Sequence, residues 1–263
     1  TRARPGPALA LADAAVPTGA GLADHVRRVA GIPLPGARRE AEDVVRAFSS
    51  GSRVVTGRDA SEAFLKTGDL RDYSLIHLAT HAVADESAPE RSAVLLAPTE
   101  GADDGLLTVP EIAVLPLRGK VVVLAACESQ VGAVRRGEGV LSLARSFFEA
   151  GATAVVGTLG SVRDSDTESF FRDFYATLEG GGTVSSALAE AKRLAIHRGA
   201  PPAAWSRFVL VGDGAATPRE APARVWLWLG GLLGLGVVGW LVRALEIGRV
   251  RKSDPLQRPN APS

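Results

Sequence analysis

A cysteine and a histidine each follow a run of apolar residues typical of a buried β-strand. Cys127, the single cysteine of the chain, follows Lys120-Val-Val-Val-Leu-Ala-Ala126. His81 follows Tyr73-Ser-Leu-Ile-His-Leu-Ala79 and Thr80. Because catalytic groups gather beyond the carboxyl ends of strands in an open α/β sheet, we expect both side chains at one edge of the same sheet. A thiolate beside an imidazole base is an arrangement suited to nucleophilic catalysis.

The spacing of this pair weighs against the commoner role of a lone cysteine, which is that of a small buried hydrophobic residue. The 46 residues that separate His81 from Cys127 are close to the roughly 50 found between histidine and nucleophile in caspases. The sequence has neither the Gly-x-Ser-x-Gly elbow of serine hydrolases nor the Gly-x-x-x-x-Gly-Lys loop of nucleotide-binding proteins. A Cys–His hydrolase is therefore the leading interpretation.

Four motifs between residues 8 and 214 resemble, in order and spacing, those of the CHAT domain. That family belongs with the caspase-like cysteine peptidases, alongside separase and the metacaspases. The motifs are His77-Leu-Ala-Thr-His81, Val122-Val-Leu-Ala-Ala-Cys-Glu-Ser129, Gly137-Glu-Gly-Val-Leu-Ser-Leu-Ala-Arg145 and Trp205-Ser-Arg-Phe-Val-Leu-Val-Gly-Asp213.

This resemblance implies a fold, an activity and a set of site residues. The fold would be α/β, with a caspase-like, mostly parallel sheet and helices on both faces. The family's His–Cys dyad corresponds to His81 and Cys127, and its oxyanion hole to the backbone amides of Ala82 and Cys127. Such a protein would be a cysteine endopeptidase that cleaves a protein partner. The alternative is a catalytically silent CHAT domain that serves as a membrane-tethered interaction or signalling module.

Composition narrows the remaining classes of function. The formal net charge of +1 gives no overall basic field for nucleic acid, and a single cysteine excludes an internal disulfide or a thiolate-rich metal site. We expect no metal and no cofactor. The chain begins at Thr1 and contains no methionine, so we expect a fragment or a processed product. In the CHAT family tetratricopeptide repeats often precede the domain, and we expect such a part upstream.

The hydrophobic pattern alternates between strand-like and helix-like segments, which predicts a mostly parallel sheet covered on both faces. The expected strands are 8–16, 53–56, 73–79, 93–97, 120–126, 152–159 and 207–211. The expected helices are 34–48, one capped near Asp59, one opened by a capping box at Thr108–Glu111, 138–150 ended by Gly151, 166–179 and 183–198.

Three further groups of residues have candidate roles. Asp164 and Asp166 follow the strand 152–159 and so lie at the same edge. By resemblance to caspase-like relatives they are candidates to line an acidic pocket for a basic P1 side chain, and the alternative for Asp164 is a solvated loop charge. Asp166 has an alternative role as the N-cap of its helix. His77 lies four residues before His81, or roughly 13 Å back along the strand, and is interpreted as a structural or supporting residue. His197 lies late in a helix and is not expected to be catalytic.

The C-terminal part of the chain predicts a membrane anchor. We divide the chain into the CHAT domain (1–216), a linker (217–224), a transmembrane helix (225–242) and a basic, disordered tail (243–263). The 18 uncharged residues from Val225 to Val242 span about 27 Å as a helix, close to the thickness of a bilayer core. Within them, Gly230-x-x-x-Gly234 suits a homodimer through the membrane helix.

The side of the membrane that holds the catalytic domain stays open. Five basic residues follow the predicted span and three precede it, which favours a cytoplasmic tail and an external domain. The survival of a reduced thiol favours the opposite arrangement. The prediction is therefore a single-pass membrane protein without an assigned orientation.

Overall fold

The structure is a computed structural model, and it describes residues 5–16, 24–30, 32–85, 88–99, 101, 103–125, 138–159 and 162–219. The strands are β1 (Ala8–Ala14), β2 (Arg53–Gly57), β3 (Leu75–Ala79), β4 (Ala82–Val83), β5 (Ala93–Leu95), β6 (Leu106–Thr108), β7 (Val121–Leu124), β8 (Ala154–Thr158) and β9 (Phe208–Gly212). The helices are α1 (Asp24–Ala30), α2 (Ala37–Ala47), α3 (Glu62–Thr67), α4 (Val109–Ala113), α5 (Glu138–Glu149), α6 (Asp164–Glu179) and α7 (Val184–His197), with 3₁₀ turns at Pro89–Arg91 and Pro202–Ala204.

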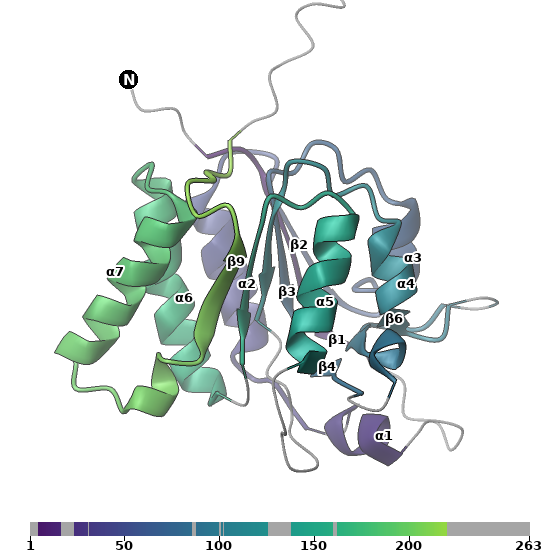
Figure 1. The fold of residues 1–263 in the computed structure, drawn as a ribbon. Coiled ribbons are helices and arrows are strands. Elements are labelled where there is room, and N and C mark those ends of the chain that lie inside the picture. Colours follow the sequence, from purple (N-terminus) through teal and green to yellow (C-terminus); the bar gives the residue numbers. More distant parts are fainter. Residues whose placement is uncertain are drawn as a thin grey trace, which may run out of the picture. The chain divides into compact units, whose positions relative to one another are not determined.

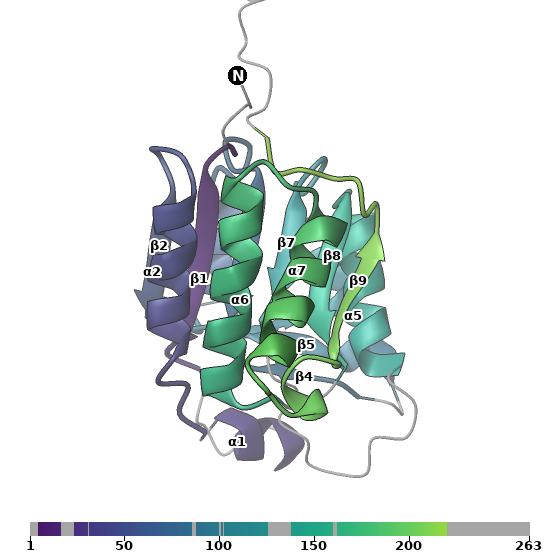
Figure 2. The same cartoon turned by 90° about the vertical axis from the view of Figure 1, so that its left-hand side faces the viewer.

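Six strands form the main sheet, in the order β2-β1-β3-β7-β8-β9. All neighbours are parallel except β8 and β9. Helices α2, α6 and α7 cover one face, and α3, α4 and α5 lie on the other (Figure 1). Figure 2 shows the first of these faces, with α2 and α6 side by side in front of the strands. The predicted α/β fold with a mostly parallel sheet is confirmed.

The central strands are buried on both faces, as their apolar runs predict. Every residue of β3, β7 and β8 is buried. Alternate side chains serve two cores: Leu75 and Ala79 face the layer of α2 and α6, whereas Ile76 and Leu78 face the layer of α3 to α5. Such strands have one workable register, since a slip of one residue would exchange the two sets.

The helix α2 illustrates how the sequence pattern places a helix on the sheet. Ala37, Ala41 and Val44 recur at the spacing of one helical face and are buried against β1 and β3. Phe48, directly after the helix, meets Tyr175 of α6 edge-on, with ring centroids 5.9 Å apart. The helix therefore packs on the sheet with α6 beside it.

Helix and strand boundaries differ from the predicted ones by a few residues, with two informative exceptions. The helix expected to be capped near Asp59 begins later, because the Ser61 hydroxyl accepts the amide of Phe64. The helix expected from Asp166 begins two residues earlier, at Asp164. The capping box of Thr108 with Glu111 and the end of α5 at Gly151 (φ +96°) are as predicted.

A small antiparallel sheet of β4, β5 and β6 was not predicted beyond its middle strand. Its strand β4 begins at Ala82, directly after His81, and pairs with Val94 of β5. The short helix α1 packs on this sheet through Val26 and Val29. The small sheet therefore anchors the chain just beyond β3.

The predicted membrane span, the linker after residue 219 and the tail lie outside the described residues. Within the part of the chain that the structure does describe, no helix combines the length and the apolar character needed to cross a bilayer.

Candidate active site

The carboxyl edge of the main sheet has a topological switch point between β1 and β3. From β1 the chain goes first to β2 on one side and then to β3 on the other. Ligands in open α/β sheets bind in the crevice that such a reversal leaves beyond the strand ends. Asp13, Thr80 and His81 all line a pocket of about 210 Å³ at this position. The site that the fold itself favours is thus the site of His81.

The imidazole of His81 is held by the backbone of a distant segment. Its Nε2 lies 2.6 Å from the carbonyl oxygen of Ile32. A carbonyl can only accept a hydrogen bond, so Nε2 carries the proton and donates it. In the neutral ring the lone pair is then on Nδ1, which is the nitrogen able to act as a base.

Burial also sets the charge state of this ring. His81 is 4% exposed, and desolvation lowers its pKa below the ordinary value, with the Ile32 carbonyl opposing this to a lesser extent. A lowered pKa keeps the ring neutral at physiological pH, which is the form that a general base requires.

The backbone around His81 is fixed by the small sheet. The Leu95 amide donates to the carbonyl oxygen of His81 at 2.8 Å. The hydroxyl of Thr80 donates to the carbonyl oxygen of Leu95 at 2.6 Å. Thr80 is itself buried. The two bonds tie the end of β3 to β5, so the position of the ring does not depend on a free loop.

Asp13 lies at the end of β1 in an unusual backbone conformation. Its φ is +49°, in the left-handed region that aspartate tolerates better than most residues. The pairing of β1 with β2 shifts register between Ala12 and Ala14, so Asp13 forms a bulge. Bulges at strand ends redirect side chains, and this one places Asp13 in the wall of the pocket. Its carboxylate pairs with Arg38 at 3.1 Å, and both side chains are about half exposed.

The predicted site residues are described to different extents. Cys127 lies in the segment 126–137, outside the described residues, as does the side chain of Asp164. Asp166 is the third residue of α6 and pairs with Arg163, with Nε and Oδ2 2.9 Å apart. It is therefore not the N-cap of the helix, because the cap position belongs to Arg163.

An oxyanion-hole amide at Ala82 that required a positive φ would be strained, because alanine carries a Cβ atom. Ala82 is buried, lies in β4, and is not among the described non-glycine residues with positive φ. Its role in an oxyanion hole stays a prediction.

His77 is fully buried, in keeping with its interpretation as a supporting residue. Its Nδ1 shares a hydrogen bond of 2.7 Å with the Tyr175 hydroxyl. Its Nε2 lies 2.9 Å from Oε1 of Glu40, within ion-pair distance but not at hydrogen-bond angles. Burial, and next the Glu40 charge, raises the pKa of Tyr175 well above its ordinary value. His197 is the last residue of α7 and is not among the residues that line the His81 pocket.

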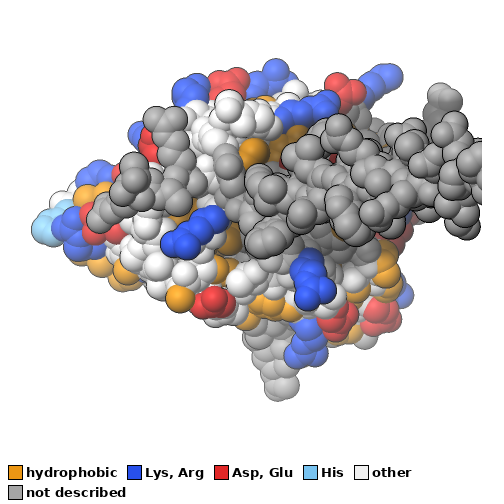
Figure 3. All heavy atoms as spheres, turned by 90° about the horizontal axis from the view of Figure 1, so that it is seen from above, with side chains coloured by type: hydrophobic (Ala, Val, Ile, Leu, Met, Phe, Trp, Pro, Cys, Tyr) orange, Lys and Arg blue, Asp and Glu red, His pale blue; other side chains and the backbone are white. Residues whose placement is uncertain are grey.

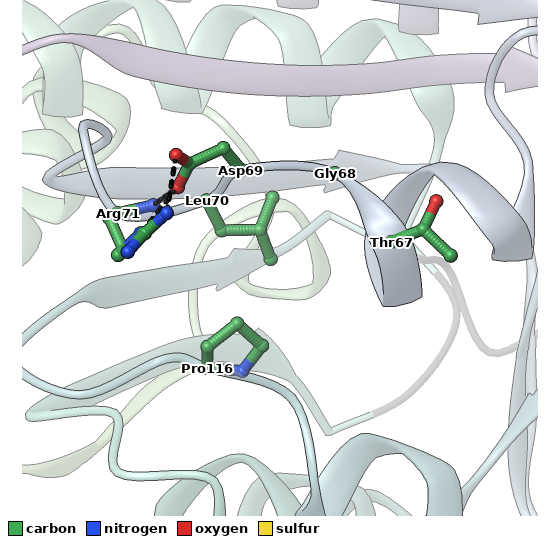
Figure 4. A pocket seen from close by; sticks show the side chains of 6 residues that line it. All are labelled: Thr67, Gly68, Asp69, Leu70, Arg71 and Pro116. Carbon is green, nitrogen blue, oxygen red and sulfur yellow. Dashed lines mark hydrogen bonds and ion pairs between the residues drawn. The ribbon is translucent and has the colours of Figure 1, made fainter.

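A second hollow, of about 380 Å³, lies at the amino edge of the sheet, between α3 and β3. Figure 4 shows Asp69 and Arg71 turned toward each other at its rim, and their charges pair at 2.9 Å. Over the described part of this edge, acidic and basic side chains are interspersed (Figure 3). Although larger, this hollow offers a ligand no converging polar groups comparable to those around His81.

Two contributors to the site were missed by sequence reasoning. The Ile32 carbonyl has no signature, because every residue carries one. Asp13 offered a usable signal, since it ends an apolar strand just as His81 does.

Comparison with known proteins gives two curated relatives. Tetratricopeptide repeat protein 28 of Homo sapiens is 34% identical over 110 residues, and that of Mus musculus is 33% identical over 110 residues. The match covers 41% of this chain but 4% of either relative. The chain thus corresponds to a small part of much longer proteins.

Among solved structures, the chain is similar to the Arg-specific cysteine proteinase gingipain R (TM-score 0.49, 12% identity, 82% of this chain and 48% of that one). It is also similar to Saccharomyces cerevisiae separase in complex with securin, with a TM-score of 0.44 and 16% identity. That match covers 82% of this chain and 12% of the separase–securin chain. A third similar structure is the Drosophila initiator caspase Dronc, with a TM-score of 0.42 and 11% identity. That match covers 82% of this chain and 83% of the Dronc chain.

The family follows from the sequence profile. The profile of the CHAT domain matches residues 2–213, which is most of the chain and includes β1 through β9. This chain belongs to the CHAT domain family.

Proposed function

We propose that this protein is a caspase-like cysteine endopeptidase, in which His81 is the general base for Cys127 and a protein partner is the substrate. In this mechanism Nδ1 of His81 takes the proton of the Cys127 thiol, and the thiolate attacks the scissile carbonyl. The imidazolium then protonates the leaving amine. Water hydrolyses the resulting thioester and releases the second product.

The register of β3 and β7 is the observation that carries the proposal. Leu78 pairs with Leu124, and the same offset of 46 residues holds along the whole pairing. His81 and Cys127 are also 46 residues apart, so each lies three residues beyond a paired leucine. Adjacent strands are about 4.8 Å apart. Two residues that follow adjacent parallel strands by the same number of residues are well placed for their side chains to meet, and His81 and Cys127 are such a pair.

The substrate side chain would enter the pocket that Asp13 and His81 share. Its wall includes the apolar Val16 and Leu34, and Asp13 supplies a carboxylate. The half-exposed pair of Asp13 with Arg38 is weak, so a lysine or arginine of a substrate can replace Arg38. Asp13 thus joins Asp164 and Asp166 as a candidate for reading a basic P1 residue.

The membrane anchor belongs to the same proposal. A single helix over residues 225–242 would hold the domain at a bilayer and restrict its substrates to proteins near that surface. Pairing of two such helices through Gly230 and Gly234 would give a homodimer. The relatives' name is in keeping with tetratricopeptide repeats upstream of the domain, and those repeats would present the protein partner.

The alternative function is a catalytically silent interaction module. The two are separated by reacting Cys127 with iodoacetamide in the wild type and in His81→Gln, and by screening a peptide library with Cys127→Ala as the blank. The peptidase predicts Cys127 alkylation that slows at least tenfold in His81→Gln, with cleavage absent from Cys127→Ala. Equal alkylation rates and no cleavage in any variant would support the silent module.

A further inference from the structure

Two contacts join the same two chain segments. One segment runs from Ile32 into α2, and the other from His77 to His81. At the outer end, Nε2 of His81 donates to the Ile32 carbonyl at 2.6 Å. At the inner end, Nε2 of His77 lies 2.9 Å from Glu40. Both histidines therefore turn the same ring nitrogen toward an oxygen of the opposite segment, one in the site and one in the core.

The inner contact is deeply buried. Glu40 is 2% exposed and His77 is 0% exposed. Tyr175 of α6 completes the group through its hydrogen bond to His77. Phe171, also on α6, meets the His77 ring edge-on with centroids 5.7 Å apart. Residues of α2 and α6 thus contact both nitrogens of the His77 ring.

Stability alone does not account for such a group. Moving a carboxylate out of water is costly, and apolar residues of similar volume often replace a buried ionic pair without loss. Apolar packing tolerates small shifts between elements. A carboxylate that faces one imidazole nitrogen does not tolerate such shifts. The contact between Glu40 and His77 weakens as soon as α2 moves along β3. The group is suited to fixing the position of α2 on β3.

The connection from α2 to Ile32 is short and stiff. Pro33 and Pro35 have fixed φ angles, and the residue before each proline is restricted to extended conformations. The Ala37 amide donates to the Leu34 carbonyl at 3.1 Å, and the Glu40 amide to the Gly36 carbonyl at 2.9 Å. A displacement of α2 is therefore passed on to the Ile32 carbonyl rather than absorbed between them.

We propose that Glu40 and His77 are positioning residues for His81: through α2 and the two-proline segment, they hold the Ile32 carbonyl against Nε2 of the site histidine. The carbonyl in turn keeps the proton on Nε2 and the lone pair on Nδ1. The consequence for cleavage rests on the proposed function, whereas the positioning of the ring does not.

The test observes the His81 ring by NMR in the full 263-residue chain labelled with ¹⁵N-histidine. The chain has four histidines, and His81→Gln identifies the His81 signals. In the wild type, the ring nitrogen shifts should show the Nε2-protonated form alone. In Glu40→Gln, which keeps the size of the side chain, they should move toward a mixture of the two tautomers.

A fully apolar replacement separates positioning from stability. The triple variant Glu40→Leu, His77→Leu, Tyr175→Phe removes all three of these polar side chains together, so none of the three is left facing a lost partner. Its thermal midpoint should stay within a few degrees of the wild type, while the His81 tautomers mix and Cys127 alkylation falls at least fivefold. The matched control is Glu62→Gln, a buried carboxylate on the opposite face of the sheet, which should lower the midpoint and leave the His81 signals unchanged.

A second variant keeps the test decisive if the triple variant fails to fold. Pro33→Ala with Pro35→Ala leaves the buried group intact and loosens only the connection, so the same mixing of His81 tautomers is expected. Wild-type His81 signals in this variant and in Glu40→Gln would overturn the inference. Because the NMR measurement needs no cleavage, failure of the peptidase proposal alone would leave these spectra as expected. An active peptidase with unresponsive His81 signals would refute the positioning alone.

Discussion

The bond from Nε2 of His81 to the Ile32 carbonyl decides which ring nitrogen can serve as a base. It uses the proton of the buried ring at 2.6 Å and leaves the lone pair on Nδ1. Desolvation, the stronger influence, lowers the pKa of the same ring. The Ile32 carbonyl thus sets which nitrogen of His81 carries the proton, and burial of the ring sets its charge state.

The lowered pKa predicts how activity depends on pH. The acid limb of kcat/KM reports the base of the free enzyme, so its midpoint should lie below about 6.5, the ordinary value for histidine. Cleavage measured from pH 5 to pH 8 gives the midpoint directly. A midpoint above that of free histidine would contradict the assignment of a desolvated His81 as the base.

The same shift predicts a pH-dependent stability. The unfolded chain binds a proton at His81 below about pH 6.5, whereas the folded chain binds it only below its lower pKa. Stability is therefore present above the unfolded pKa and declines as pH falls through the window down to the folded pKa. Urea unfolding at a series of pH values should show this decline, and His81→Gln should lack that part of it.

The sequence predicts those parts of the site that a local run of residues encodes, and it does not predict those that depend on contacts between distant segments. His81 follows a run of apolar residues whose length and β-branching identify a strand, so its place at the sheet edge could be predicted. The elements α1, β4 and β6 could not, because they span only seven, two and three residues, which is too short for a repeated pattern of apolar residues. The bulge that redirects Asp13 is set by pairing with a strand about 40 residues away, and no local pattern encodes it.

Either Asp13 or Asp166 could select a substrate with a basic P1 residue, and substitution of each carboxylate distinguishes the two. Asp13 lines the pocket, while Asp166 pairs with Arg163 on α6. We expect Asp13→Asn to slow cleavage after lysine or arginine by about tenfold, equivalent to about 1.4 kcal/mol, and to leave cleavage after apolar residues unchanged. Asp166→Asn is the matched control. A selective loss in Asp166→Asn instead would return the role to α6.

An ion cluster that links α3 to α4 should dominate the stability of that region. Lys66 bonds Glu62 and lies 3.0 Å from Asp103 and 2.8 Å from Glu111. Burial raises the pKa of Glu111, but its hydrogen bonds to Lys66 and Thr108 and the Lys66 charge together outweigh burial and lower the pKa to about 2. Because Glu62 is 1% exposed, Lys66→Met would leave it buried without its cation. We expect a loss of about 3 kcal/mol in urea unfolding; Lys192→Met, which removes a lysine from α7, should cost far less.

The topology of the predicted anchor can be read by proteolysis. The excess of basic residues after position 242 favours a cytoplasmic tail, so protease added to intact cells or spheroplasts should digest the CHAT domain. A tag after Ser263 should stay protected until the membrane is opened. Protection of the domain and digestion of the tag would reverse the orientation, and release of the whole chain by salt would exclude a span.

The strand order of the main sheet has a consequence for synthesis of the chain. After β1 and β2, the strands β3, β7, β8 and β9 are added on one side in the order in which they leave the ribosome. Each new strand therefore finds its neighbour already made, and no earlier strand needs to move aside. His81 emerges long before the strand that leads to Cys127. In the proposed dyad the base is therefore made 46 residues before the nucleophile, and cleavage by the nascent chain has to wait until Cys127 has followed.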